Sequence, residues 1–473
     1  MRGFTWVVAV VVSVGVVGAA GGCGTKRNPN ICCTDEADCS GAGLPIGTTC
    51  APGELCRGHE CIELTCAAST QCDLTAPFCN GGTCADSCED DTSCPGFGQV
   101  GSPFCVEEQC VECREGMSDC ANARICDGNV CRDCANNDEC ATGLCTAAGS
   151  CATPDDVAFA HPLGSATSAC TEADPCTLQR AVALTPTRRF IQISPGSYQN
   201  AATLELNGSR VLTGAGADQV SITNTGTGPV LAVADNADIT VEGLKIFGAK
   251  NGATAGAGIT CTTGTLQVRA VIITMNASHG IQSSCKLELR EASLISNGGF
   301  GLDHVATPPT AYLIERCSVV SNGTGGVRVS GSGIARNNSI TRNLGVGLEL
   351  RSSFQGTAVS EFNTIVANKT NGLLCSALFM TPKPIVANSI VALNETGDFF
   401  MASDCTIAST LITEDGFNSA GFRFKSPNSA PFDYHLEFGS IAVDAATGMT
   451  AVDFDGDTRP KGTAADVGAD EAF

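Results

Sequence analysis

Acid–base chemistry needs carboxylates held a few ångströms apart, and one column of repeated positions in this chain contains such a pair. Gln282, Asp303, Arg328 and Glu349 follow the glycine and aliphatic residue of successive units. If each unit adds one strand to a sheet, Asp303 and Glu349 lie about 10 Å apart, near the long end for an inverting hydrolase. Arg328 between them favours the ionised form of both, so neither makes a good general acid. We therefore predict a salt-bridged ladder, and catalysis by Asp303, Glu349 and Arg328 is the alternative.

A second column alternates in charge along the same units. Its members are Arg269, Arg290, Glu315, Arg336 and Glu361. Opposite charges on neighbouring strands predict cross-strand ion pairs on a solvated face. Binding of an anionic glycan at the Arg269–Arg290 end is the alternative.

Cation-binding residues occur near the C-terminus. Asp453, Asp455 and Asp457 have the 1, 3, 5 spacing of calcium ligands, and Gly456 permits a tight bend. Ala464 stands at position 12, where a calcium loop has glutamate. We predict a folded terminal turn without a cofactor, and bound calcium is the alternative.

The remaining residues make a poor inventory for a hydrolase, which needs two or three close carboxylates. Asp303 is the only aspartate between Ile239 and Gly397. No nucleophile elbow, phosphate loop or zinc-protease motif is present. The histidines share no common spacing: His59, His161, His279, His304 and His435. The inventory favours a protein that does not catalyse a reaction.

The elements that must position these residues repeat every 21 to 26 residues. Each unit contains an asparagine: Asn276, Asn297, Asn322, Asn343, Asn368 and Asn394. A glycine follows four residues later in the first five units, and an aliphatic residue follows the glycine. This periodicity indicates a solenoid whose asparagine amides form a structural ladder from turn to turn.

Further columns identify the kind of solenoid. Apolar residues alternate with polar ones over short segments, as in strands, and no segment has the length and periodicity of a helix. An aliphatic column contains Ile273, Leu294, Val319, Ile340, Ile365 and Ile390. A second inward column contains Val271, Ala292, Cys317, Asn338, Asn363 and Asn388. We predict an all-β, right-handed parallel β-helix.

Cysteines within the solenoid lie at corners of neighbouring turns. Cys261 and Cys285 occupy one corner, and Cys375 and Cys405 occupy another. Neighbouring turns are about 4.8 Å apart, which allows disulfides. Cys317 falls in an inward column and is expected to be a free, buried thiol.

Most of the 30 cysteines lie between Cys32 and Cys151. They form five units of four, with Cys32 and Cys50 in addition, and few large apolar residues separate them. Such units need disulfides in place of a core, which implies export. They resemble the cysteine-rich stalk repeats of exported myxobacterial-type lipoproteins. We predict a disulfide-rich stalk over residues 23–152, and a receptor-like binding module is the alternative.

Residues 1–22 have the features of a signal peptide: Arg2, an apolar run and small residues before Cys23. Ala20-Gly21-Gly22-Cys23 resembles a bacterial lipobox, although Ala20 stands where the family prefers leucine. The resemblance implies lipidation of Cys23 and attachment to the outer membrane. Cleavage without lipidation, giving a secreted protein, is the alternative.

Two further resemblances frame the solenoid, predicted over residues 166–473 after a linker at 153–165. The segment Cys170 to Tyr198 resembles the beginning of bacterial parallel β-helix proteins, with a helix at Thr177–Val182 that covers the open end and a Cys170–Cys176 disulfide. The segment Asp453 to Glu471 resembles their closing motif.

The formal net charge of −22 argues against nucleic acid as a partner. We predict a cell-surface scaffold that binds or displays polysaccharide or another envelope component. Many β-helices of this shape are polysaccharide lyases or hydrolases, so a carbohydrate-active enzyme is the alternative. A structural adhesin or spacer is the second alternative.

Overall fold

The computed structural model describes most of the chain from residue 104 onward and parts of the preceding region. The described residues are 54–57, 60–63, 78–80, 83–85, 88–91, 94 and 104–472, apart from 118, 147, 185–187, 253–254, 306–309, 352–355, 377–381, 402–403 and 414–420. The chain divides into two compact units, Met1–Ala135 with Ala147–Ser150, and Asn136–Thr146 with Cys151–Phe473. The predicted signal peptide and Cys23 lie outside the described residues.

The strands described in the first unit pair as short antiparallel hairpins. They are β1 (Glu54–Arg57) with β2 (Glu60–Glu63), β3 (Phe78–Asn80) with β4 (Thr83–Ala85), β5 (Phe104–Val106) with β6 (Gln109–Val111), and β7 (Ile125–Asp127) with β8 (Val130–Arg132), with a 3-10 helix, η3 (Ala121–Ala123), before the last. In two complete repeats the first cysteine bonds the third and the second bonds the fourth: Cys88–Cys105, Cys94–Cys110, Cys113–Cys126 and Cys120–Cys131. Buried cystines take the place of an apolar core here.

The second unit begins with the 3-10 helices η4 (Asn137–Glu139) and η5 (Pro154–Asp156) and continues into three parallel sheets. The eleven-stranded sheet contains β9 (Val157–Ser165), β10 (Phe190–Ile193), β13 (Ser209–Gly214), β16 (Asp238–Glu242), β19 (Thr265–Arg269), β22 (Lys286–Arg290), β25 (Tyr312–Glu315), β28 (Gly333–Arg336), β31 (Ala358–Glu361), β34 (Ile385–Ala387) and β37 (Thr406–Ala408).

The ten-stranded sheet contains β11 (Gly196–Asn200), β14 (Val220–Asn224), β17 (Lys245–Phe247), β20 (Ile272–Thr274), β23 (Ser293–Ile295), β26 (Ser318–Val320), β29 (Ser339–Thr341), β32 (Thr364–Val366), β35 (Ile390–Ala392) and β38 (Leu411–Ile412). The nine-stranded sheet contains β12 (Leu204–Leu206), β15 (Leu231–Val233), β18 (Ile259–Cys261), β21 (Ile281–Ser283), β24 (Phe300–His304), β27 (Gly325–Ser330), β30 (Val346–Arg351), β33 (Asn371–Ser376) and β36 (Gly397–Phe400).

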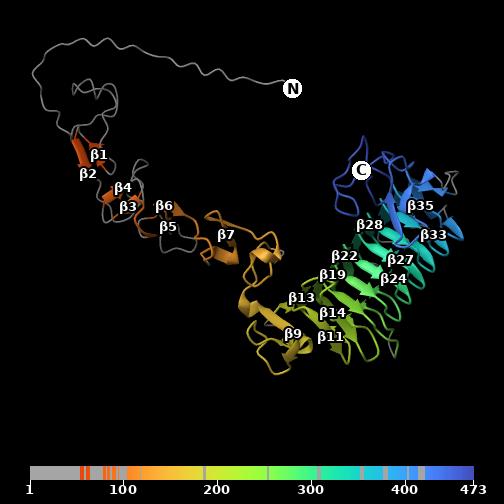
Figure 1. The fold of residues 1–473 in the computed structure, drawn as a ribbon, viewed down its shortest axis with the longest axis horizontal. Helices are drawn as coiled ribbons and strands as arrows, with labels where there is room; N and C mark the ends of the chain where they lie inside the picture. Colours follow the sequence, from red (N-terminus) through yellow and green to blue (C-terminus); the bar gives the residue numbers. More distant parts are fainter. Residues whose placement is uncertain are drawn as a thin grey trace, which may run out of the picture. The chain divides into compact units, whose positions relative to one another are not determined.

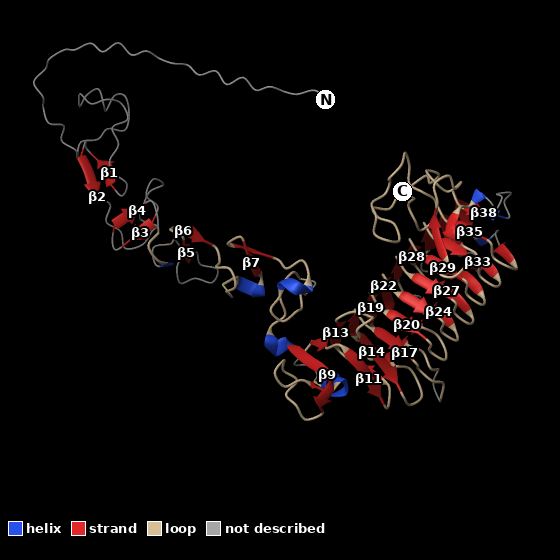
Figure 2. Ribbon diagram, viewed as in Figure 1, coloured by secondary structure: helices blue, strands red, loops and turns tan. Residues whose placement is uncertain are grey.

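Each turn contributes one strand to each sheet, so successive turns stack as rungs (Figure 1). Almost all regular structure in this unit is strand (Figure 2). The second unit is a right-handed parallel β-helix, as the repeat predicted. In the ten-stranded sheet the aliphatic column points into the core: Ile246, Ile273, Leu294, Val319, Ile340, Ile365, Val391 and Ile412.

The six repeat asparagines form one hydrogen-bonded ladder, and all but the last, Asn394, are buried. Each amide oxygen accepts a hydrogen bond from the amide nitrogen of the preceding asparagine, at 2.9–3.0 Å in each of the five pairs. Asp398 ends the ladder, because its Oδ1 accepts the last amide, that of Asn394, at 2.8 Å. The residue before each asparagine adopts positive φ, which turns the chain at this corner.

The second inward column differs from the prediction at its last position. Ser389, rather than Asn388, accepts the backbone N–H of Asn363 through its Oγ, at 3.1 Å. Asn388 has a φ of 47° and occupies the preceding corner position, a conformation that asparagine tolerates well. The same one-residue shift places Val391 in the core and turns Ile390 outward. The prediction was wrong because it aligned Asn388 with Asn338 and Asn363 by residue type. In the structure, Asn388 instead has the positive φ of the corner residue, and Ser389 takes the inward position.

The N-terminal end of the β-helix is covered as predicted. Helix α2 (Leu178–Ala183) begins after Thr177, whose Oγ1 accepts the N–H of Arg180. Its apolar face, Leu178, Ala181 and Val182, packs on the core. Residues 157–165, predicted as part of a linker, instead form β9, which pairs with β10 as the first strand of the eleven-stranded sheet.

The predicted disulfides of the β-helix are present: Cys170–Cys176, Cys261–Cys285 and Cys375–Cys405. Cys317 is free and buried, and burial raises the pKa of its thiol to about 12. Disulfides of this number are compatible with an oxidising compartment outside the cytoplasm. Within the described residues, no helix has the length and apolar character needed to cross a bilayer.

Residues 421–472, called the closing segment below, fold back over the outer face of the ten-stranded sheet (Figure 1). The segment contains the antiparallel hairpin of β39 (Phe424–Ser426) and β40 (Asp433–Leu436). Outward residues Val366 and Ile390 pack against Phe424, Leu436 and Val467. The outer face of the sheet is therefore apolar at its last strands.

Candidate functional site

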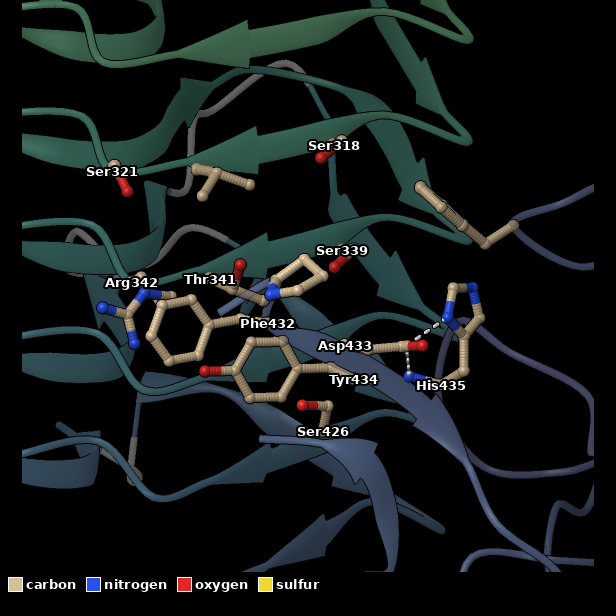
Figure 3. Close-up of a pocket in the computed structure, with 13 residues that line it drawn as sticks. Ser318, Ser321, Ser339, Thr341, Arg342, Ser426, Phe432, Asp433, Tyr434 and His435 are labelled. Carbon is tan, nitrogen blue, oxygen red and sulfur yellow. Dashed lines mark hydrogen bonds and ion pairs between the residues drawn. The ribbon is translucent and has the colours of Figure 1, made fainter. Parts of the chain in front are cut away.

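A cleft lies where the closing segment meets the uncovered part of the ten-stranded sheet (Figure 3). Its volume is about 700 Å³. The cleft is lined by Ser318, Val320, Ser321, Ser339, Thr341, Arg342, Ser426, Pro431, Phe432, Asp433, Tyr434, His435 and Phe454. It therefore combines hydroxyl groups from the β-helix with aromatic and charged side chains from a segment about 100 residues later in the chain.

The floor of the cleft follows from strand alternation. Val319 and Ile340 point into the core, so the flanking residues of β26 and β29 must point outward. Ser318 and Ser339 are register partners on these neighbouring strands. The floor is therefore flat and presents short hydroxyl side chains.

One end of the cleft is formed by an arginine on an aromatic ring. Arg342 stands at a corner of the β-helix with a φ of 57°, which directs its side chain along the outer face. Its guanidinium lies 3.4 Å from the centre of the Phe432 ring, a cation–π contact. Phe432 is 39% exposed, so this ring also presents apolar surface toward solvent.

The other end is lined by His435 and Asp433, and two further carboxylates, Asp455 and Asp470, interact with the imidazole from outside the cleft lining. Asp433 Oδ1 accepts hydrogen bonds from Nδ1 and from the backbone N–H of His435, the latter at 2.9 Å. Asp455 Oδ2 lies 2.9 Å from Nε2 of the same ring. Burial alone would lower the pKa of His435, but the bond to Asp433 and the charges of Asp470 and Asp455 outweigh it and raise the pKa. Burial raises the pKa of Asp470.

The terminal motif holds the closing segment in place. Asp453 Oδ1 accepts the N–H groups of Asp455 and Asp457, at 3.0 and 2.8 Å. The buried Arg459 donates to the carbonyl oxygens of Asp466 and Gly468, both at 2.9 Å. These bonds form the folded terminal turn that the sequence predicted.

Docking of this turn onto the sheet requires a glycine. Gly468 has a φ of 103°, and a Cβ there would lie 2.7 Å from Ile390 Cδ1 and 2.9 Å from Thr364 Oγ1. The Gly468 N–H donates to the carbonyl of Asn388 at 2.9 Å. The Ala469 N–H donates to Thr364 Oγ1 at 2.9 Å.

The three calcium candidates do not converge on a common point. Asp453 bonds backbone N–H groups, Asp455 faces His435, and Asp457 pairs with Lys461 at 2.8 Å. The interactions of these aspartates stabilise the folded terminal turn. The metal-ligand geometry in this part of the chain instead includes His435, a residue for which sequence spacing offered no signal.

The first catalytic candidates lie elsewhere, on the nine-stranded sheet. Gln282, Asp303, Arg328 and Glu349 are register partners on adjacent strands, as predicted. Arg328 binds Asp303 through two hydrogen bonds, at 2.7 and 2.6 Å. Arg351 lies 2.6 Å from Glu349. Both carboxylates are thus held in ion pairs, and none of these residues lines the cleft.

The second predicted column forms ion pairs on the eleven-stranded sheet. Glu315 lies between Arg290 and Arg336, and it pairs with both. The Nε of Arg336 lies 2.6 Å from Glu315. Arg269 is the most exposed arginine of this column, with 63% of its side chain accessible, and it pairs with Glu291 at 3.6 Å.

No protein-family model matches the chain, and no curated protein matches it. Among solved structures it is similar to a pectate lyase, with 13% identity over 68% of this chain and 97% of that chain, and a TM-score of 0.39. It is also similar to the A-module of an Azotobacter vinelandii mannuronan C-5 epimerase, with 15% identity, 47% and 68% coverage and a TM-score of 0.38. A rhamnogalacturonan lyase shows 11% identity, 56% and 90% coverage and a TM-score of 0.30. Similarity at this level concerns the fold alone.

Proposed function

We propose that this protein is an exported cell-surface protein whose cleft binds an extended, uncharged polysaccharide. The observation that carries the proposal is the composition of the cleft. Sugars offer apolar C–H faces, which aromatic rings contact, and hydroxyl groups, which need hydrogen-bonding partners. Phe432 and Tyr434 supply the rings, and the serine and threonine side chains of the floor supply the hydroxyls.

The geometry supports a chain rather than a single sugar. The outward column of serines continues beyond the cleft, because Ser318 pairs in register with Ser293 on β23. A polymer lying across the strands would meet a serine at three successive rungs, Ser293, Ser318 and Ser339, about 4.8 Å apart. The flat floor therefore suits an extended ligand.

Charge favours an uncharged polymer. The cleft has a positive charge, Arg342, at one end and the carboxylates around His435 at the other, so neither sign of charge is favoured along its whole length. The net charge of −22 would repel a strongly anionic chain.

Phe432 provides the test, with Phe438 as the matched control because it is 82% exposed and does not line the cleft. The full chain is titrated with neutral and anionic polysaccharides. Phe432→Ala should weaken binding by about tenfold, since an aromatic contact contributes roughly 1.5 kcal/mol. Phe438→Ala should change affinity less than twofold. Equal effects of the two variants, or the absence of binding, would reject the proposal.

A carbohydrate-active enzyme is the second candidate, favoured by His435, a proton-transfer group at the cleft wall held by Asp433. Reducing-sugar and unsaturated-product assays on each bound polysaccharide distinguish the two. Turnover abolished by His435→Asn supports catalysis, and binding without turnover supports the scaffold. A chain that neither binds nor cleaves any polysaccharide would be a structural spacer.

We further propose that Cys23 is lipidated and attaches the protein to a membrane, with the cysteine-rich repeats as the spacer. A thioether lipid with an amide-linked chain anchors a protein without a spanning helix. Metabolic labelling with palmitate should be lost in Cys23→Ala. A labelled variant, or an unlabelled wild type, would contradict lipidation.

A further inference from the structure

Three side chains near the cleft have the arrangement of metal ligands. One ligand atom from each of His435, Asp455 and Asp470 lies within 4.8 Å of the other two. In a tetrahedral site, ligands at about 2.1 Å from one ion lie about 3.4 Å apart. Side-chain movements of up to roughly 1.4 Å would therefore bring all three onto one ion.

The fold of the closing segment fixes these residues in place. His435 lies on β40, and the neighbouring Leu436 N–H donates to Asp470 Oδ2 at 2.5 Å. The N–H of Asp455 is held by Asp453. Backbone contacts thus position the three side chains before any ligand arrives.

The imidazole is oriented as in a metal site. A metal-ligating histidine usually donates its second ring N–H to a carboxylate, which fixes the tautomer. Here Asp433 accepts from Nδ1, and Nε2 faces Asp455. Asp433 is therefore the positioning residue, and Nε2 is the ligand atom.

The charge balance gives an independent argument for a cation. Asp433, Asp455 and Asp470 surround one imidazole, and Asp470 is only 8% exposed. Within the described part of the chain, no lysine or arginine forms an ion pair with Asp455 or Asp470. Buried charges are normally paired or bound to metal. Here His435 and the charge of Arg459, which acts on Asp470 without forming an ion pair with it, face three carboxylates.

From this geometry and charge we infer that His435, Asp455 and Asp470 bind a divalent transition-metal ion, with zinc the best match. Imidazole together with carboxylate oxygens suits zinc, whereas calcium takes six to eight oxygen ligands. The site lies in the closing segment and does not include Asp457. Metal binding does not depend on whether the cleft binds polysaccharide, so the two proposals can fail separately.

Asp455 and Asp457 make a matched pair of variants, with 47% and 43% of their side chains exposed. The full chain, with its disulfides intact, is stripped with EDTA and titrated calorimetrically with zinc, manganese and calcium chlorides. We expect one zinc per chain. Asp455→Asn should weaken zinc binding at least about tenfold, and Asp457→Asn should leave it within about twofold. His435→Asn provides a second loss-of-binding variant.

Three outcomes would overturn the site. One is the absence of saturable zinc binding below about 1 mM. Another is zinc binding that Asp455→Asn and His435→Asn both leave unchanged, which would place the ion elsewhere. The third is tighter binding of calcium than of zinc together with its loss in Asp457→Asn, which would assign the ion to the aspartate loop.

Discussion

Removing an asparagine from the middle of the ladder should lower the unfolding free energy of the β-helix more than removing the asparagine at the first rung. Asn322 Oδ1 accepts hydrogen bonds from the backbone and side-chain nitrogens of Asn297, both at 3.0 Å. Its Nδ2 donates to Leu294 O and to Asn343 Oδ1, both at 2.9 Å. Asn322→Ala removes four bonds and leaves two buried donors of Asn297 without this acceptor. Since each such donor costs about 1–3 kcal/mol, we expect a loss of about 4 kcal/mol in unfolding free energy.

Asn276, the first rung, is the control. Its Oδ1 accepts only the backbone N–H of Ala249, at 3.0 Å. Its own amide donates to Asn297 Oδ1, which still accepts the backbone N–H of residue 276 after substitution. Asn276→Ala should therefore cost only about 1–2 kcal/mol.

Urea unfolding of the disulfide-intact chain, followed by far-ultraviolet circular dichroism, measures both variants. Equal losses for Asn322→Ala and Asn276→Ala would refute the idea that an unbroken ladder matters. A loss below about 1 kcal/mol for Asn322→Ala would show that the bonds contribute little beyond what water offers the unfolded chain.

Two further predictions concern docking and pH. Gly468→Ala should detach the closing segment, because a Cβ would clash with Ile390. The amide hydrogens of the closing segment should then exchange at least about tenfold faster. Gly208→Ala is the control, because a Cβ at Gly208 meets no atom within 4 Å, and it should leave this exchange unchanged. Unchanged exchange would contradict the steric argument. Burial lowers the pKa of His304 in the folded chain. As the pH falls, His304 is therefore protonated in the unfolded chain before it is protonated in the folded chain. The unfolding free energy should consequently decrease below about pH 6.5. His304→Leu should flatten this dependence between about pH 6.5 and 5.5, and an unaltered slope would count against it.

The architecture of the β-helix could be predicted because each turn repeats the same local demands. The inward column of Ile273 holds an aliphatic residue in every turn of the repeat, and the column of Asn276 holds an asparagine, so both recur at a recognisable spacing. Disulfide pairs such as Cys261 and Cys285 follow once the turns are aligned. The prediction failed where residue type was a poor guide to geometry, as at Asn388, which resembles a ladder residue but forms a corner.

The cleft could not be predicted from spacing, because it depends on how the closing segment docks. Arg342 and Phe432 are in contact although 90 residues separate them. His435 was one of five unclustered histidines in the sequence, and only the hairpin brings it to Asp455 and Asp470. Residues 157–165 were missed for a local reason, since Pro162 and Gly164 interrupt the strand pattern without ending the strand.

Two acidic clusters within the described residues differ in what surrounds them, and this difference supports the proposal of a site in the closing segment. On the nine-stranded sheet, Asp303 is held by Arg328 and Glu349 by Arg351. Each of these carboxylates already has a guanidinium partner, so neither presents an unpaired charge to a ligand. Around His435, three carboxylates share one imidazole beside a cleft of about 700 Å³. Three carboxylates next to open volume can bind a ligand, and this is the reason why we propose a function for the end of the repeat.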